Sequence, residues 1–168
     1  MKVEKTKLSG VLLITPEIFR DHRGEYIETY NEKTYKENGI PVDFIQDDIS
    51  VSKKDVLRGI HGDQETWKLI SCAYGKIYAV IVNCDETSES FGKWQAFNIS
   101  DENRSQVLAP PKHGVAHLVL SEKAIFHYKQ STYYNPGGQF TYKWNDPRFN
   151  IDWPINNPIL SQRDESGK

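Results

Sequence analysis

Leu57-Arg58-Gly59-Ile60-His61 is followed along this chain by Lys68 and, after the apolar run Leu69–Ala73, by Gly75. These segments bring one arginine, one imidazole and one lysine to a single predicted cavity. Guanidinium and ammonium groups hold anions, and an imidazole takes up or releases a proton near neutral pH. The pattern therefore predicts a site that binds an anionic substrate and moves a proton.

The spacing of His61, Asp63, Lys68 and Gly75 resembles the metal motif of cupin barrels, but the ligands differ. That motif carries a second histidine two residues after the first, then a glutamate and a glycine. Here a lysine stands at the carboxylate position, and hard or borderline metal ions do not accept an ammonium group as a ligand. We therefore predict a site without a metal ion.

Composition and charge exclude several classes of protein. The 168 residues suit one domain, residues 1–168, and the net charge of −2 provides no overall field for nucleic acid or an acidic membrane. Cys72 and Cys84 form neither a zinc pattern nor a disulfide framework. The first residues, Met1-Lys2-Val3-Glu4-Lys5, lack the apolar run of a signal peptide. We expect a cytoplasmic protein with no nucleic-acid or membrane partner.

Short runs of strand-forming residues, separated by turn signals, predict an all-β barrel or sandwich. The predicted strands are Val11–Ile14, Tyr26–Tyr30, Leu69–Ala73, Ile77–Asn83, Trp94–Ile99, Gln106–Ala109, Ala116–Leu120, Ala124–Lys129 and Gln139–Lys143. One short peripheral helix is predicted over Asn31–Asn38, with Asn31 as its cap and Gly39 at its end.

Several short sequence motifs occur in a characteristic order from near the start of the chain to its end. They are Phe19-Arg20-Asp21-His22-Arg23-Gly24, Gln46-Asp47-Asp48-Ile49-Ser50, Leu57-Arg58-Gly59-Ile60-His61, Ser90-Phe91-Gly92-Lys93-Trp94, Tyr128-Lys129 with Tyr133-Tyr134, Trp144-Asn145-Asp146-Pro147, Trp153-Pro154 and Leu160-Ser161-Gln162-Arg163-Asp164. Together they resemble the dTDP-4-dehydrorhamnose 3,5-epimerase family. The resemblance implies a double-stranded β-helix, the cupin-like jelly roll, with short peripheral helices. It also implies a homodimer that acts on a nucleotide-linked 4-keto sugar without a metal or other cofactor.

Inversion of a carbon next to a ketone needs a base, an acid and a positive group at the ketone oxygen. The chemistry makes His61 the base. The resemblance implies that Asp164 holds its ring, that Tyr128 is the acid and that Lys68 stabilises the enolate oxygen. Each residue also has a simpler interpretation. His61 could be a structural histidine and Asp164 a solvated carboxylate of the tail. Tyr128 could belong to the core, and Lys68 could be a surface amine.

The resemblance also assigns the substrate-binding residues. Arg23 and Arg58 match a diphosphate clamp, with Gln46 as a nearby donor, although Arg23 could instead close a turn. Tyr134, together with Tyr26 and Glu28 from the dimer partner, matches positions that hold the base and ribose.

A second active-site histidine is expected on the strand near residue 117. Either His117 occupies that position or an ungapped register places Val115 there, and a one-residue error in a strand exchanges its two faces.

Some departures from the family pattern widen the choice of substrate. The segment from His61 to Lys68 is about three residues shorter than usual, and Asp48 stands where the family usually has asparagine. We expect a dTDP- or GDP-linked deoxyhexose or heptose with C3, C5 or both inverted, as in the biosynthesis of surface polysaccharides. The alternatives are a 3,4-ketoisomerase and a sugar-nucleotide-binding relative without catalysis.

Overall fold

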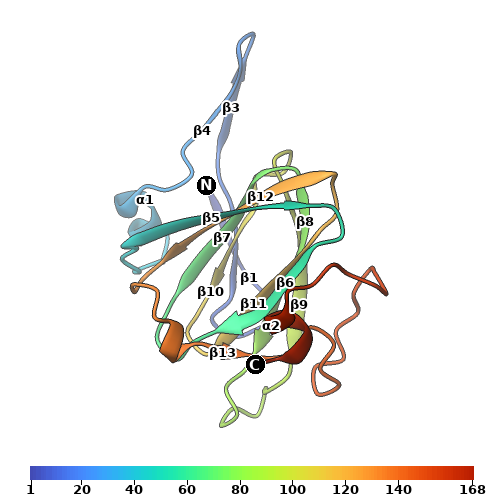
Figure 1. Cartoon of the computed structure of the whole chain (residues 1–168). Helices are drawn as coiled ribbons and strands as arrows, with labels where there is room; N and C mark the ends of the chain where they lie inside the picture. The colour runs from blue at the N-terminus through green and yellow to red at the C-terminus, as the bar shows by residue number, and fades with distance from the viewer.

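Two antiparallel sheets face each other in the computed structural model, which describes all 168 residues (Figure 1). The first sheet has the spatial order β1 (Lys2–Lys5), β2 (Leu12–Thr15), β10 (Gln106–Ala109), β7 (Lys68–Tyr74), β12 (Lys123–Gln130) and β5 (Gln46–Lys53). The second has the order β13 (Phe140–Thr141), β6 (Leu57–Gly62), β11 (His113–Val119), β8 (Lys76–Asn83) and β9 (Trp94–Ser100). Neighbouring strands are mostly distant in the sequence, as in a jelly roll, and the predicted all-β class is confirmed.

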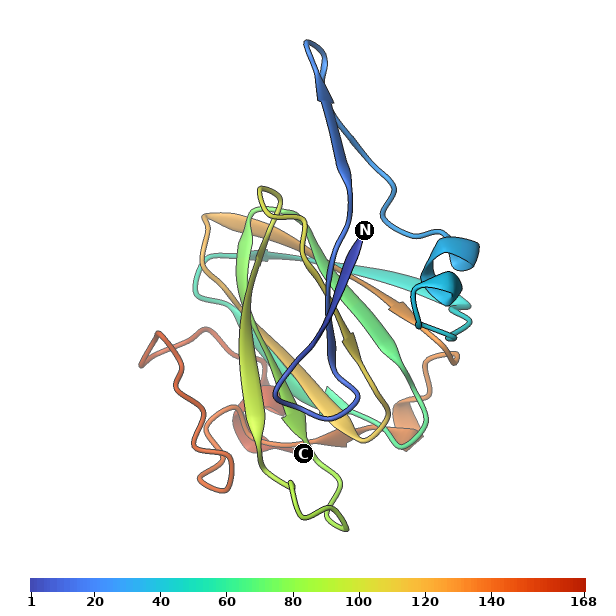
Figure 2. The ribbon, with the colours of Figure 1, turned by 180° about the vertical axis from the view of Figure 1, so that it is seen from behind.

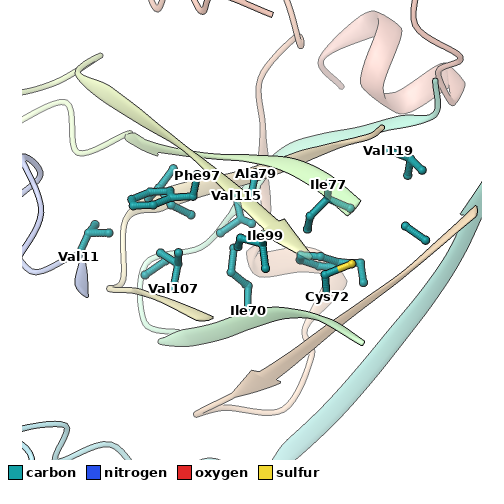
Figure 3. Packing of buried hydrophobic residues seen from close by; sticks show 14 of the residues in the cluster. Val11, Ile70, Cys72, Ile77, Ala79, Phe97, Ile99, Val107, Val115 and Val119 are labelled. Carbon is teal, nitrogen blue, oxygen red and sulfur yellow. The ribbon is translucent and has the colours of Figure 1, made fainter. Parts of the chain in front are cut away.

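The main hydrophobic core fills the space between the two sheets (Figure 3). Ile77, Ala79 and Ile81 of β8 point into this core, and Ile70 of β7 meets them from the other sheet. The alternate residues of β8 also lie in a hydrophobic cluster, which Phe149 and other residues of the C-terminal segment cover. Because both faces of β8 are buried, its sequence is a continuous apolar run.

Four strands whose sequences contain many polar residues were not predicted. These strands are β1, β5, β6 and β3 (Ile18–Asp21). In β5, exposed side chains alternate with half-buried ones, and few of them are apolar. The predicted strand Tyr26–Tyr30 corresponds to β4 (Gly24–Ile27), so its C-terminal part is wrong.

The strands β3 and β4 pair only with each other. Their hairpin projects well away from the two sheets in both views (Figures 1 and 2). Phe19 and Tyr26 are exposed on it, with centroids of their rings 6.5 Å apart. Large exposed aromatic side chains on an isolated hairpin indicate a segment that packs against another surface.

The predicted helix is present as α1 (Glu32–Glu37), and its caps are the expected ones. The Asn31 side chain accepts a hydrogen bond from the backbone N–H of Thr34, and Gly39 follows with φ of +83°. A single 3-10 turn, η1 (Pro136–Gly138), precedes β13, and a second helix, α2 (Gln162–Ser166), lies near the C-terminus. Neither helix has the length or the apolar run that crossing a membrane requires.

Candidate active site

A cavity of about 350 Å³ lies between the sheets and gathers most of the predicted site residues. Strands β5, β6, β7, β11 and β12 contribute to its wall, together with the segment before β13 and the start of α2. The predicted residues that line it are Arg58, His61, Lys68, His117, Tyr128, Tyr134 and Asp164. Residues from distant parts of the chain therefore meet in one pocket.

An irregularity in β6 allows Arg58 and His61 to face the same cavity, although an odd spacing would place them on opposite faces of a regular strand. Opposite them in β11, His117 pairs with Arg58 and Val115 with His61, so three steps along β6 match two along β11. This extra residue is a β-bulge, which redirects side chains. Gly59 lies inside the bulge with φ of +113°, and a Cβ there would come within 2.5 Å of the Val115 carbonyl oxygen. Only glycine fits this position.

His61 and Asp164 form a close pair. The His61 Nε2 atom lies 2.7 Å from Oδ1 of Asp164. Nε2 is buried and has no aligned hydrogen bond, so the pair is an electrostatic contact between ring and carboxylate. The contact places a negative charge where it stabilises an imidazolium ion.

Asp164 is held by groups from two parts of the chain. Its Oδ1 accepts a hydrogen bond from the backbone N–H of Gly59 at 3.1 Å, and its Oδ2 accepts one from the Ser161 hydroxyl at 2.6 Å. Burial alone would raise the pKa of Asp164, but His61, Ser161 and Gly59 together lower it below its usual value. Only 3% of the residue is exposed, so it is not a solvated tail carboxylate.

Lys68 starts β7 and is buried, with 8% of its surface exposed. The interpretation as a surface amine is therefore wrong. Burial lowers the pKa of its ammonium group, the charge of Asp63 counteracts this, and the nearby charge of Arg163 adds to the lowering. A desolvated ammonium group at the wall of a cavity interacts strongly with a negative charge that develops on a bound molecule.

His117 and Val115 both line the cavity, because they lie two residues apart on the same face of β11. The His117 ring stacks on Phe126 with centroids 4.0 Å apart, and its Nε2 is buried without a hydrogen-bond partner. Burial, aided by the positive charge of Arg58, lowers the pKa of His117 to about 3. His117 therefore presents a neutral ring with one unpaired nitrogen.

Tyr128 and Tyr134 lie on the same side of the cavity as β5. Burial raises the pKa of Tyr128, so its hydroxyl keeps its proton at neutral pH, and the ring also packs against the core. Tyr128 therefore lines the cavity and also packs against the core, and its role as the acid stays a prediction. The backbone N–H of Tyr134 donates to Oε1 of Gln46 at 2.9 Å, so Gln46 supports the wall of the pocket from behind.

No group of three or more His, Cys, Asp or Glu side chains is arranged to hold a metal ion. Asp63, which occupies a ligand position in the cupin pattern, instead accepts hydrogen bonds from the backbone N–H groups of Glu65 and Thr66 and from the side chain of Gln139.

The chain matches the family model for dTDP-4-dehydrorhamnose 3,5-epimerase over residues 5–168. The chain belongs to this family. It is 40% identical over 169 residues to the dTDP-4-dehydrorhamnose 3,5-epimerase of Salmonella typhimurium, and the match covers 98% of this chain and 92% of that one. Among solved structures, the Bacillus anthracis epimerase with TDP and PPi bound has a TM-score of 0.95 at 33% identity, covering 99% of this chain and 98% of that one.

A Legionella pneumophila dTDP-6-deoxy-D-glucose-3,5-epimerase in complex with dTDP-4-keto-L-rhamnose has a TM-score of 0.92 at 36% identity, covering 97% of this chain and 89% of that chain. The relatives establish the jelly-roll fold and the enzyme class of this epimerase, an isomerase that acts on nucleotide-linked 4-keto sugars.

Besides Gln46, which does not line the cavity, three predicted binding residues of this epimerase lie outside the cavity of a single chain. Arg23, Tyr26 and Glu28 belong to the projecting hairpin and its C-terminal extension. The Arg23 guanidinium pairs with Asp21 at 2.6 Å, and the backbone N–H of Arg23 donates to Asp21 as in a turn. Within one chain, Arg23 and Arg58 therefore do not form the predicted clamp, because the hairpin points away from the sheets.

Sequence analysis assigned no role to Ser50, Gln139, Ser161 and Arg163, although all four line the cavity of the epimerase. Ser161 and Arg163 appeared in the sequence analysis only as members of the C-terminal motif that contains Asp164. The spacing of Ser161 and Asp164 carried a signal for a helix start, since serine is a preferred N-cap and acidic residues favour the first turn.

Proposed function

We propose that the epimerase inverts its substrate by proton transfer at the carbon next to the sugar ketone, with His61 as the base. The observation that carries this proposal is the His61–Asp164 contact of 2.7 Å beside a cavity that also contains Lys68 and Tyr128. His61 removes the proton, and the C–H electron pair passes into the enolate. Asp164 stabilises the imidazolium ion, and Lys68 stabilises the enolate oxygen.

Tyr128 returns a proton to the opposite face of the same carbon in this proposal. Its raised pKa keeps the hydroxyl protonated until the enolate forms. The enolate electron pair then forms the new C–H bond, the tyrosinate recovers a proton from solvent, and the His61 imidazolium ion releases its proton to solvent. No electrons are gained or lost overall, so the cycle needs no redox partner.

The substrate diphosphate is assigned to Arg58, and the nucleoside to the wall formed by Tyr134 with Gln46 behind it. We also propose that a second copy of the chain supplies Arg23, Tyr26 and Glu28. Tyr26 is 69% exposed on the projecting hairpin, which suits insertion beside a neighbouring barrel. A homodimer with exchanged hairpins would complete both sites by the same contact.

Mixing two inactive variants tests this arrangement. In a dimer of an Arg23→Ala chain with a His61→Asn chain, one site receives an intact hairpin beside an intact barrel. Random mixing should restore about a quarter of the wild-type activity. Activity that stays at the level of the separate variants would refute a shared site.

We also propose that the polar lining of a second cavity favours a substrate with a hydroxylated extension, such as a GDP-linked heptose, over a 6-deoxyhexose. A cavity of about 230 Å³ lies beside the main one, shares Gln139 with it and has no hydrophobic residue in its lining. Asp63 and Thr66, from the shortened segment after His61, form part of that lining. Polar walls suit additional hydroxyl groups better than a methyl group.

A panel of dTDP- and GDP-linked 4-keto sugars in deuterium oxide tests the proposed function. The enzyme should incorporate deuterium at C3, C5 or both and yield an inverted product. Movement of the keto group without inversion would instead indicate a 3,4-ketoisomerase, and tight binding without exchange would indicate a binding protein.

A further inference from the structure

We propose that Ser161 is a positioning residue for the reaction: its hydroxyl donates to Asp164 and fixes the carboxylate that faces His61. This inference rests on the proposed role of His61 as the base. Ser161 does not need to touch the reacting carbon, since it acts through Asp164.

The direction of the hydrogen bond follows from the charge of the acceptor. The Ser161 Oγ atom lies 2.6 Å from Oδ2 of Asp164, and an ionised carboxylate has no proton to donate. The single hydroxyl proton of Ser161 therefore points at Asp164. The same oxygen accepts a hydrogen bond from the backbone N–H of Asp164 at 3.2 Å, as the N-cap of α2. One hydroxyl thus both starts the helix and holds the carboxylate.

The two carboxylate oxygens have separate tasks. Oδ1 faces His61 and the backbone N–H of Gly59, whereas Oδ2 faces Ser161. The Ser161 hydroxyl is the only protein group that donates to Oδ2, so without it the carboxylate would lose that support and could rotate away from the ring. The backbone of Gly59 holds only the other oxygen, so it cannot replace Ser161.

The loss of the Ser161 donor has a predictable effect on the proton affinity of the His61–Asp164 pair. The active pair consists of neutral His61 and ionised Asp164, which carries one negative charge. A donor to that charge favours the active form over the form that has taken up a proton. Removing the donor must therefore shift the acidic limb of the pH–rate profile to higher pH.

Two substitutions separate the donor from the helix cap. Ser161→Gly keeps most of the capping, since glycine costs only a few tenths of a kcal/mol at an N-cap, but it removes the hydroxyl. Ser161→Thr keeps both. Ser166→Ala is the matched control, because Ser166 is exposed at the other end of α2 and its hydroxyl reaches only the carbonyl oxygen of Arg163 at 3.5 Å.

The measurement is the pH dependence of kcat/KM and kcat on the best substrate of the panel. For Ser161→Gly we expect the midpoint of the acidic limb of the pH–rate profile to shift upward by about one pH unit. We also expect kcat to fall on the order of tenfold, with KM little changed. Ser161→Thr and Ser166→Ala should keep the wild-type limb. An unmoved limb in Ser161→Gly, or loss of activity only in proportion to loss of folded protein, would overturn the inference. Failure of the proposed function looks different, because the wild-type enzyme itself would then show no exchange.

Discussion

Replacing Lys68 with methionine should make the protein more stable and almost inactive. Lys68 is 8% exposed, and Asp63 is the carboxylate whose charge acts on its ammonium group. Methionine has a similar length and no charge. The substitution therefore removes the cost of burying the ammonium group while it keeps most of the packing.

The magnitude follows from these opposing effects. Desolvating one ion costs several kcal/mol, and Lys68 forms no ion pair that would fully repay this cost. Since Asp63 offsets part of this cost, we expect a gain of about 1 to 2 kcal/mol in the free energy of unfolding near neutral pH. For a chain of this size the gain corresponds to a rise in Tm of about 2 to 8 °C.

The gain should also depend on pH. The pKa of Lys68 is lowered in the folded protein, so above that pKa the unfolded chain binds more protons than the folded one. Stability of the wild-type protein then rises with pH until the lysine is also neutral in the unfolded chain, at about pH 10.4. The advantage of Lys68→Met is therefore full below the folded pKa and decreases toward alkaline pH.

Thermal unfolding of both proteins between about pH 7 and pH 10 measures this difference, and the deuterium-exchange assay measures activity. Exchange should fall by about 10² to 10³ if the ammonium group stabilises the enolate oxygen. Lys53→Met is the matched control: Lys53 is exposed at the end of β5, so its replacement should change stability by less than about 0.5 kcal/mol. A Lys68→Met protein that is less stable than the wild type at neutral pH, or a gain that is independent of pH, would refute the reasoning.

Three further results are expected. His61→Asn should lower solvent exchange by about 10² to 10⁴ and leave nucleotide binding intact, which calorimetry can check; exchange near the wild-type rate would exclude His61 as the base. Tyr128→Phe should retain exchange by His61 but lose net inversion, so equal loss of both activities, with binding intact, would argue against a separate acid. Dialysis against a strong chelator should leave activity unchanged, because Lys68 occupies the carboxylate position of the cupin motif; activity that zinc, iron or manganese restores would contradict that reasoning.

The central strands were predictable because their short apolar runs, rich in strand-forming residues, are typical of strands inside a sheet. The predicted Ile77–Asn83 and Gln106–Ala109 correspond closely to β8 and β10, in which nearly every residue is buried. In contrast, β5 is an edge strand with polar residues on both faces, so its strand structure depends on pairing with β12. Local sequence does not record that pairing.

The types of residue in the candidate site were also predictable, but their geometry was not. His61 and Asp164 were named as a pair through the motifs of the family, and they are far apart in the sequence. Arg58 and His61 were expected at one cavity, but a regular strand would place them on opposite faces, and only the bulge at Gly59 turns both toward the cavity. A bulge arises from the mismatch between β6 and β11, which only the paired strands reveal.

The amino-acid sequence by itself determined the all-β class, the family and the set of side chains available for chemistry, since these depend on composition, alternation and motif order. The tertiary structure alone decided that Lys68 and Asp164 are desolvated, that His117 is neutral with an unpaired nitrogen, and that the hairpin carrying Arg23 points away from its own barrel. The burial of a side chain, its electrostatic environment and the site that it can contact depend on which distant segments pack together. No local pattern of residues encodes these contacts, so the electrostatics of the site become visible only when the two sheets close around it.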